Sequence, residues 1–334
     1  MLKKGAYLFL ILFATMFVVA CSRMPKKGSS SQNFVMPSDK LKVLSTTTII
    51  DDLVAKIGKE HIVHTSLITG QLDPHSYELV KGDDDKISNA DVLLYNGLGL
   101  EHGASLKYHL ENAENAYAIS DSIQDDTAFI FVDGQVDPHI WMDLSLLAKA
   151  AIPVGKILAK HDPLHEKEYM QNAKDLEGKM LALDRQMEVT LGRIPKESCY
   201  LVTSHDAFYY FTRRYLAKDN ERASGEWKKR CRAPEGLAPD GQMSPKDIGA
   251  IVEYALSYGV EVVFTESNVN QDALKKVVKI IKQKGSLADL SEKPLYGDTM
   301  GEEGSGAEDY LKMMEYNSKL ISEHLCKTHE RSLL

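Results

Sequence analysis

Cysteine is scarce in this chain of 334 residues, and positive charge is not in excess. Lysine and arginine number 40 against 48 aspartates and glutamates, so the formal net charge is −8 and no electrostatic support exists for binding nucleic acid. The four cysteines include no Cys-x-x-Cys pair, which argues against a thiolate metal site. No zincin motif with a glutamate general base is present either.

The first residues have the form of an export signal. Lys3 and Lys4 precede an apolar stretch, residues 6–20, that is too short to span a bilayer comfortably and ends in a small residue before Cys21. This arrangement resembles a bacterial lipobox, although Val18 replaces the more usual leucine. We expect a signal peptide over residues 1–21, with Cys21 lipidated, and a flexible tether over residues 22–40. An exported soluble protein and an uncleaved anchor remain alternatives.

Three further cysteines, Cys199, Cys231 and Cys326, follow in the body of the chain. Export would permit a disulfide, but an odd number leaves at least one thiol free. Cys199 begins an apolar strand and is predicted to be a buried thiol. Cys231 and Cys326 form the most plausible pair, with free thiols at both positions as the alternative.

Strand-like and helix-like segments alternate along the body of the chain, which predicts an α/β fold with mainly parallel sheets. Its length suggests two domains, with a third as an alternative. The predicted elements are strands at residues 41–47, 92–95, 200–203 and 260–265, a helix with Ile49, Leu53 and Ile57 on its apolar face, and a helix at residues 273–284.

The middle of the chain predicts one long helix. From Pro163 to Leu191 there is no strand signal, and apolar residues recur every three or four positions until Ile194-Pro195 ends the pattern. We interpret residues 162–193 as a rigid linking helix between an N-terminal lobe, residues 41–161, and a C-terminal lobe, residues 194–334. An ordinary surface helix within one domain is the alternative.

Three histidines stand in comparable settings. Asp73-Pro74-His75 and Asp137-Pro138-His139 repeat one motif, and His205 follows a predicted strand. Ligand sites in open α/β sheets gather where strands end, and proline stiffens the loop that presents each ring. The trio therefore predicts a shared metal site. His102 is left open, and the remaining histidines are assigned no role: His61, His64, His109, His161, His165, His324 and His329.

From about residue 41 to its end, the chain resembles the solute-binding protein 9 family, the TroA/ZnuA-like metal receptors of bacterial zinc, manganese and iron ABC importers. The segments that carry the resemblance are residues 46–53, 73–78, 90–101, 137–143, 204–208 and 263–267. The family fold is two β/α lobes with mainly parallel sheets, joined by one long rigid helix. This agrees with the pattern of elements above.

The resemblance also implies a ligand set and a function. It places His75 and His139 in the first lobe and His205 and Asp298 in the second, around one divalent transition metal ion. It further implies a monomeric periplasmic or extracytoplasmic receptor, tethered to the membrane by lipid, which delivers its metal to an ABC permease. Catalysis is not expected.

Two segments depart from the family pattern. Some zinc-selective members carry a long histidine-rich loop after the first ligand. In this chain the corresponding loop, residues 81–86, is short and contains no histidine. Asp83–Asp85 are predicted to begin the next helix, because acidic residues favour a helix N-terminus. The basic segment Glu226–Arg232 is interpreted as a solvated loop, with a docking surface as the alternative.

Ligand chemistry narrows the choice of metal. Nitrogen-rich ligation suits zinc or iron better than magnesium or calcium, and manganese stays open. Four carboxylates are predicted to orient the imidazoles: Asp73, Asp137, Asp206 and Glu266. Two other functions remain as rivals, a zinc-dependent metalloenzyme and an adhesin or structural surface lipoprotein with a stabilising metal.

Overall fold

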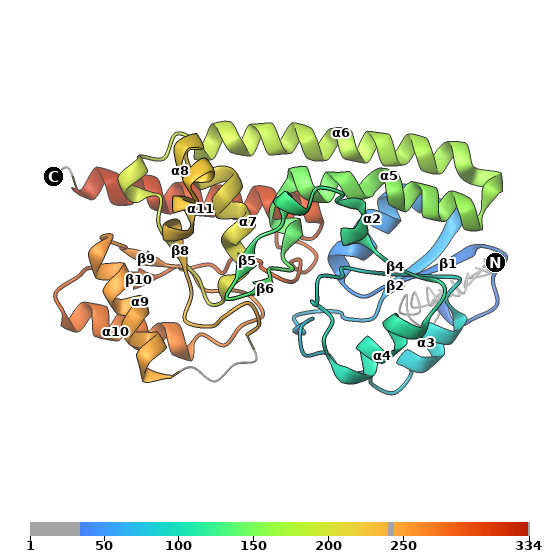
Figure 1. Ribbon diagram of the computed structural model, residues 1–334, viewed down its shortest axis with the longest axis horizontal. Helices are drawn as coiled ribbons and strands as arrows, with labels where there is room; N and C mark the ends of the chain where they lie inside the picture. The colour runs from blue at the N-terminus through green and yellow to red at the C-terminus, as the bar shows by residue number, and fades with distance from the viewer. Residues whose placement is uncertain (1–33, 240–243, 333–334) are drawn as a thin grey trace, which may run out of the picture.

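A computed structural model describes residues 34–239 and 244–332 of the chain (Figure 1). The predicted signal peptide, Cys21 and part of the predicted tether lie outside the described residues. Among the described helices, none combines the length and the apolar character that crossing a bilayer would require.

The first lobe is built on a four-stranded parallel sheet in the order β2-β1-β3-β4. Its strands are β1 (Leu41–Ser45), β2 (Ile62–Ser66), β3 (Val92–Tyr95) and β4 (Ala116–Ala118). Its helices are α2 (Thr48–Gly58), α3 (Asp83–Asn89) and α4 (Ala104–Asn112). Helix α3 begins at the three aspartates, as predicted. All five residues of β1 are buried, as befits a strand with neighbours on both sides.

The second lobe repeats this strand order with shorter strands. Its strands are β7 (Leu201–Val202), β8 (Cys231–Arg232), β9 (Val262–Val263) and β10 (Asp289–Leu290). β7 pairs with β8 and β9 with β10, both in parallel, and the Phe264 amide donates to the Val202 carbonyl at 2.8 Å. This bond joins the two pairs in the order β8-β7-β9-β10. Helices α9 (Pro245–Ser257) and α10 (Asp272–Gln283) pack against this layer.

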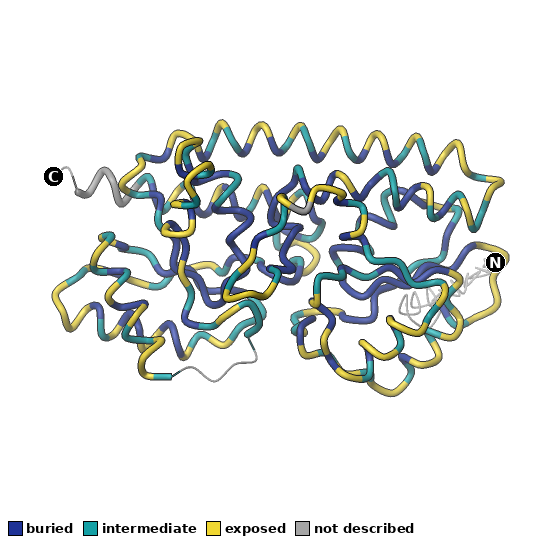
Figure 2. Tube along the Cα trace, viewed as in Figure 1, coloured by how far each residue is buried: buried dark blue, intermediate teal, exposed yellow. Residues whose placement is uncertain are grey.

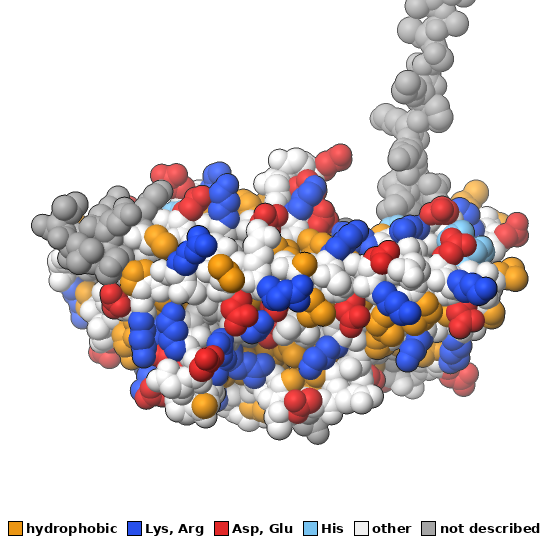
Figure 3. All heavy atoms as spheres, turned by 90° about the horizontal axis from the view of Figure 1, so that it is seen from above, with side chains coloured by type: hydrophobic (Ala, Val, Ile, Leu, Met, Phe, Trp, Pro, Cys, Tyr) orange, Lys and Arg blue, Asp and Glu red, His pale blue; other side chains and the backbone are white. Residues whose placement is uncertain are grey.

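One long helix runs along both lobes. Helix α6 (Glu166–Leu191) follows a short 3₁₀ turn and extends over the top of both halves in Figure 1, with α5 (Leu144–His161) packed beneath it on the first lobe. Its inward residues, such as Leu176, Met180 and Met187, are buried, whereas its outward turns are exposed (Figure 2). Seen from above, this side of the molecule carries charges of both signs interspersed (Figure 3). The predicted fold class is confirmed, and the exact lobe boundaries stay a prediction.

The last helix begins beside the first lobe and runs along the second lobe to the C-terminal end (Figure 1). Helix α11 (Tyr310–Ser332) lies beneath α6, and the Tyr310 amide donates to Asp52 on α2 at 3.2 Å. The remaining elements are short: β5 (Phe131–Val132), β6 (Gln135–Val136), α7 (Tyr209–Phe211), α8 (Asp219–Ser224), the 3₁₀ turns Lys59–His61, Ile119–Ser122, Asp126–Ala128, Ile140–Met142, Pro163–His165, Lys196–Ser198, Asp206–Phe208 and Glu226–Arg230, and a π turn at Thr212–Leu216.

The predicted Cys231–Cys326 disulfide is wrong. Cys199, Cys231 and Cys326 are all free thiols. Cys231 is fully buried against Thr203 and Thr212. Cys326 instead lies near Cys199, which is buried as predicted. Cys231 and Cys326 therefore lie in different environments of the fold.

The basic segment Glu226–Arg232 is only in part the solvated loop that was predicted. Lys228 and Lys229 are exposed, but Trp227 and Arg230 are buried at 5 % and 2 % exposure. The Arg230 guanidinium forms two hydrogen bonds of 2.7 Å with the Glu221 carboxylate. A buried guanidinium needs such a partner, so this segment belongs to the packing of the second lobe.

Candidate metal centre

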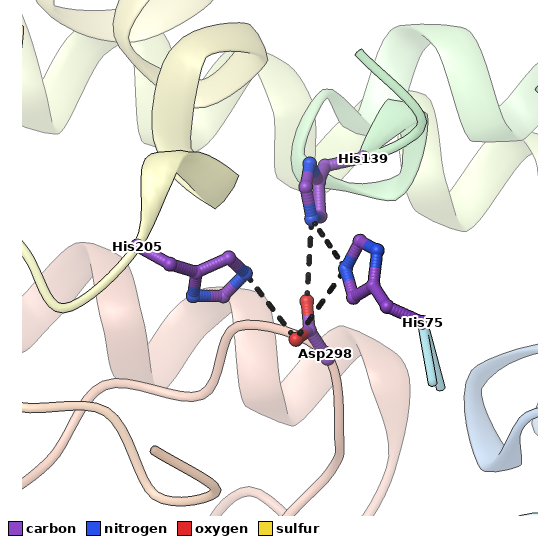
Figure 4. A group of neighbouring side chains, drawn as sticks. All are labelled: His75, His139, His205 and Asp298. Carbon is purple, nitrogen blue, oxygen red and sulfur yellow. Dashed lines mark hydrogen bonds and ion pairs between the residues drawn. The ribbon is translucent and has the colours of Figure 1, made fainter. Parts of the chain in front are cut away.

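Four side chains from the two lobes meet in one buried cluster (Figure 4). His75, His139, His205 and Asp298 each offer one ligand atom, and these atoms all lie within 4.8 Å of one another. The Nε2 atoms of His75 and His139 are 3.2 Å apart. The Asp298 carboxylate lies 3.2 Å from Nε2 of His205, 3.5 Å from that of His139 and 3.9 Å from that of His75. The structure thus brings together all four residues that the sequence singled out.

Two equivalent turns present the first-lobe histidines. The His75 amide donates to Asp73 Oδ1 at 2.9 Å, and the His139 amide donates to Asp137 Oδ1 at 3.0 Å. In each turn the aspartate carboxylate therefore accepts a hydrogen bond from the backbone amide two residues later, and the proline between them fixes its own φ angle. The repeated Asp-Pro-His sequence is a repeated piece of local structure.

The second-lobe residues follow strands of the parallel layer. His205 comes three residues after the end of β7, and Asp298 lies in the segment that follows β10. Parallel strands end at one edge of a sheet, which is where side chains of separate loops can converge. The side-chain amide Nδ2 of Asn268 donates to Asp298 Oδ2 at 3.2 Å and helps to orient the carboxylate.

Carboxylates contact the Nδ1 atoms of two of the rings, on the side that faces away from the centre of the cluster. Nδ1 of His139 lies 2.6 Å from Asp137 Oδ1, and Nδ1 of His205 lies 2.9 Å from Glu266 Oε2. A proton on Nδ1 shared with a carboxylate leaves the Nε2 lone pair free to face the centre of the cluster. The predicted role of Asp137 as a ring partner is confirmed by this hydrogen bond, and Glu266 lies at ion-pair distance from the His205 ring.

The other two predicted ring partners do not contact an imidazole in the described structure. Asp73 binds the backbone of its own turn and the Ser76 hydroxyl instead. Asp206 is buried, and burial raises its pKa to about 7. Its Oδ1 atom has no hydrogen-bond partner among the described residues. The prediction was therefore wrong for these two carboxylates.

Burial and mutual charge shift the pKa values of His75, His205 and Asp298 in the cluster. His139 and His205 are fully buried, and His75 and Asp298 are 2 % and 1 % exposed. Burial lowers the pKa of His75 well below its usual value, despite the opposing effect of Asp298. Burial would also lower the pKa of His205, but the charges of Asp298 and Glu266 outweigh it and raise that pKa well above its usual value. Burial acts to raise the pKa of Asp298, yet the nearby imidazoles hold it below its usual range.

The donor set suits a transition metal. Three imidazole nitrogens and one carboxylate oxygen, if neutral and ionised respectively, leave a divalent ion with one net positive charge. Such a nitrogen-rich set matches zinc or iron better than calcium or magnesium. A cation would also neutralise the Asp298 carboxylate, which is otherwise costly to bury.

The other histidines are not among these four residues. His102 is exposed, although its ring lies 5.9 Å from that of His75, centroid to centroid. The cluster also excludes His61, His64, His109, His161, His165 and His324. The side chain of His329 lies outside the described residues.

Sequence reasoning missed the residues that support the site from a distance. The buried Glu101 carboxylate accepts hydrogen bonds from Thr46 Oγ1 at 2.7 Å and from the Asn96 backbone amide at 2.8 Å. The Asn96 side chain in turn donates to the Pro138 carbonyl at 3.0 Å, next to His139. These residues lie in the segments that carry the family resemblance, but no local pattern indicates their distant partners.

Comparisons with known proteins identify the family. A sequence model described as zinc-uptake complex component A, periplasmic, matches residues 43–324. The chain is 40 % identical over 324 residues, 96 % of each protein, to the metal-binding protein YtgA of Chlamydia pneumoniae.

Two solved structures resemble the fold closely. The Fe(III)-bound YtgA of Chlamydia trachomatis superposes with a TM-score of 0.81 at 39 % identity, covering 86 % of this chain and 98 % of the other. The periplasmic zinc-binding protein TroA of Treponema pallidum gives a TM-score of 0.78 at 25 % identity, covering 86 % and 99 %. The chain belongs to the zinc-uptake complex component A family, the metal-binding components of ABC metal importers.

Proposed function

We propose that this protein is an extracytoplasmic receptor that captures one transition metal ion between its lobes and delivers it to an ABC permease. The ion is bound by His75, His139, His205 and Asp298. The observation that carries this proposal is the convergence of these four side chains, two from each half of the chain, with their ligand atoms within 4.8 Å.

The division of ligands between the lobes supports a receptor. A metal that contacts both lobes stabilises the arrangement in which they are closed, and a permease can select that arrangement only if it differs from the unloaded one. Four protein ligands also close the coordination shell, whereas catalytic zinc usually keeps one position for water. We therefore favour a receptor over a metalloenzyme. A structural metal in an adhesin is disfavoured by family membership.

Zinc, iron and manganese are the candidate cargoes. Zinc stands highest of the three in intrinsic affinity for such ligands, but cellular use depends on availability as well as affinity. The metals of the relatives differ as well, since one relative is bound to Fe(III) and another is named for zinc. The lipid on Cys21 and the monomeric state complete the proposal, and they rest on the sequence alone.

Removing a ligand tests the proposal. A chain that lacks residues 1–21 should bind one zinc ion per molecule, measured by competition with a chromogenic chelator. His205→Ala should lose at least about a hundredfold in affinity, because a three-ligand site remains. His109→Ala, which alters a half-exposed histidine on α4, is the matched control and should bind as the wild type does. Unchanged affinity in His205→Ala would refute the proposed site.

A further inference from the structure

The segment that carries Asp298 is hydrogen-bonded to the first lobe on both sides of this residue. On one side, Trp141 Nε1 donates to the Gly297 carbonyl at 2.8 Å. On the other side, the Thr299 hydroxyl donates to Gln71 Oε1 at 2.9 Å, and Gln71 Nε2 donates to the Met300 carbonyl at 3.2 Å. None of these bonds uses a ligand atom of the cluster. The two lobes are thus also connected beside the site by contacts in which no metal-ligating side chain takes part.

The contact at Trp141 is buried and firmly supported. Trp141 is 3 % exposed, and its carbonyl accepts a hydrogen bond from the Tyr310 hydroxyl. Its partner Gly297 is tightly packed, because a Cβ atom there would lie 2.4 Å from Glu266 Oε2. Opening this side would break a buried hydrogen bond and disturb the Glu266 carboxylate, which contacts the His205 ring. Both changes would cost free energy.

The contact at Gln71 lies closer to the surface on its first-lobe side, although its partner Thr299 is buried at 3 % exposure. Gln71 is half-buried, and it stands between Gly70, which is exposed with φ +66°, and Leu72, which is 50 % exposed. Water can reach the half-buried Gln71 side chain when its hydrogen bonds break, so this side opens at a lower free-energy cost than the side of Trp141. The same loop continues to His75, four residues later.

We propose that Gln71 is a latch for the loop that carries His75, and that its opening sets how fast metal enters and leaves the site. This inference rests on the proposed function. When the two hydrogen bonds of the Gln71 side chain break, residues 69–76 move away from Thr299 and Met300. This movement withdraws His75 from the other three ligands. Gln71 is therefore a positioning residue, which acts through the loop and does not touch the metal.

The latch has a particular thermodynamic signature. Because its bonds involve no ligand atom, they stabilise the closed loop to the same extent with and without the ion. We take this loop to be mostly closed in the metal-free protein as well, so that the difference that a permease detects lies in the other parts of the lobes. A change that favours opening equally in both states then leaves the equilibrium affinity unchanged, because the closed fraction of the metal-free protein stays close to one. It should instead raise the association and dissociation rates together.

Stopped-flow kinetics with zinc as the probe test this inference. Association is followed by mixing metal-free protein with zinc, and dissociation by adding excess chelator. In Gln71→Ala both rates should rise about tenfold, which corresponds to about 1.4 kcal/mol, while the dissociation constant stays within about twofold. Thr299→Val removes the partner hydroxyl and should raise both rates by a smaller factor. The double variant should resemble Gln71→Ala, because the two substitutions remove a shared bond.

Leu72→Ala is the matched control, because it truncates the exposed neighbour of Gln71 and leaves the latch bonds in place. Its rates should equal those of the wild type, and the melting temperatures of the metal-free variants should stay close together. Unchanged rates in both Gln71→Ala and Thr299→Val would overturn the latch. A faster dissociation with unchanged association would also overturn it, because Gln71 would then strengthen metal binding itself. A wild-type chain that takes up no zinc would instead overturn the proposed function.

Discussion

Glu266 holds His205 at two points, the ring and the backbone. Its Oε2 atom lies 2.9 Å from Nδ1 of the His205 ring, and its Oε1 atom accepts the His205 amide at 3.0 Å. Oε1 also accepts the Ser204 amide at 2.8 Å, and the Ser204 hydroxyl lies 3.2 Å from the Glu266 amide. One carboxylate therefore fixes both the path of the chain and the direction of the imidazole, so that Nε2 faces Asp298.

The first prediction concerns this carboxylate. In Glu266→Gln the amide oxygen can still accept the two backbone amides, but the NH₂ group then faces Nδ1 and donates to it. The proton of a neutral His205 would move to Nε2, which is the atom that must offer a lone pair to the metal. We expect zinc affinity to fall about 10- to 100-fold, measured by chelator competition. Glu253→Gln on the exposed side of α9 is the control. Equal affinity in both variants would contradict the proposed role of Glu266.

The second prediction concerns the thiols. Burial raises the pKa of Cys199 to about 11 and raises that of Cys231 as well, so neither forms the reactive thiolate at neutral pH. In a chain that lacks residues 1–21, a thiol reagent should modify these two cysteines only after unfolding, whereas the partly exposed Cys326 should react earlier. Three thiols should be counted in denaturant without reductant. A count of one would instead restore the disulfide between Cys231 and Cys326.

The three histidines of the cluster could be predicted from sequence because their signals are local. Pro74 and Pro138 mark stiff loops, and His205 follows a predicted strand, in a fold whose parallel strands end at one edge. Asp298 has no such local signal, and only the resemblance to the solute-binding protein 9 family implied it. The long helix was equally visible, since its apolar residues recur at helical spacing over many turns and Ile194-Pro195 ends them.

The errors arose where a distant partner decides the outcome. Arg230 reads as a solvated cation in a basic segment, but Glu221 on α8 pairs with it inside the second lobe. The Cys231–Cys326 prediction likewise assumed proximity that only the packing of α11 could establish. The hydrogen bond from Trp141 to Gly297 links residues 156 positions apart, and no periodicity indicates it. Sequence patterns fix which face of an element is buried, but not which residue lies opposite.

The third prediction concerns the Glu221–Arg230 pair and acid stability. Hydrogen bonds from Arg230 hold the pKa of Glu221 at about 2, below its usual 4.5, and they outweigh the opposing effect of burial. Because the folded-state pKa is lowered, the stability that this group contributes is fully present above about pH 4.5. It is lost as the pH falls toward 2. The difference between the two pKa values corresponds to about 3 kcal/mol at neutral pH.

Glu221→Gln imitates the protonated acid and so isolates this contribution. Urea unfolding of the metal-free protein should show the variant less stable than wild type by about 3 kcal/mol at pH 7, and by less than about 1 kcal/mol at pH 2.5. Other groups titrate over this range, but they do so in both proteins and cancel in the difference. Glu226→Gln removes an exposed carboxylate that pairs with Lys229, and it should change stability little at either pH. A gap between Glu221→Gln and wild type that persists unchanged at pH 2.5 would show that its cost comes from packing, not from the charge of Glu221.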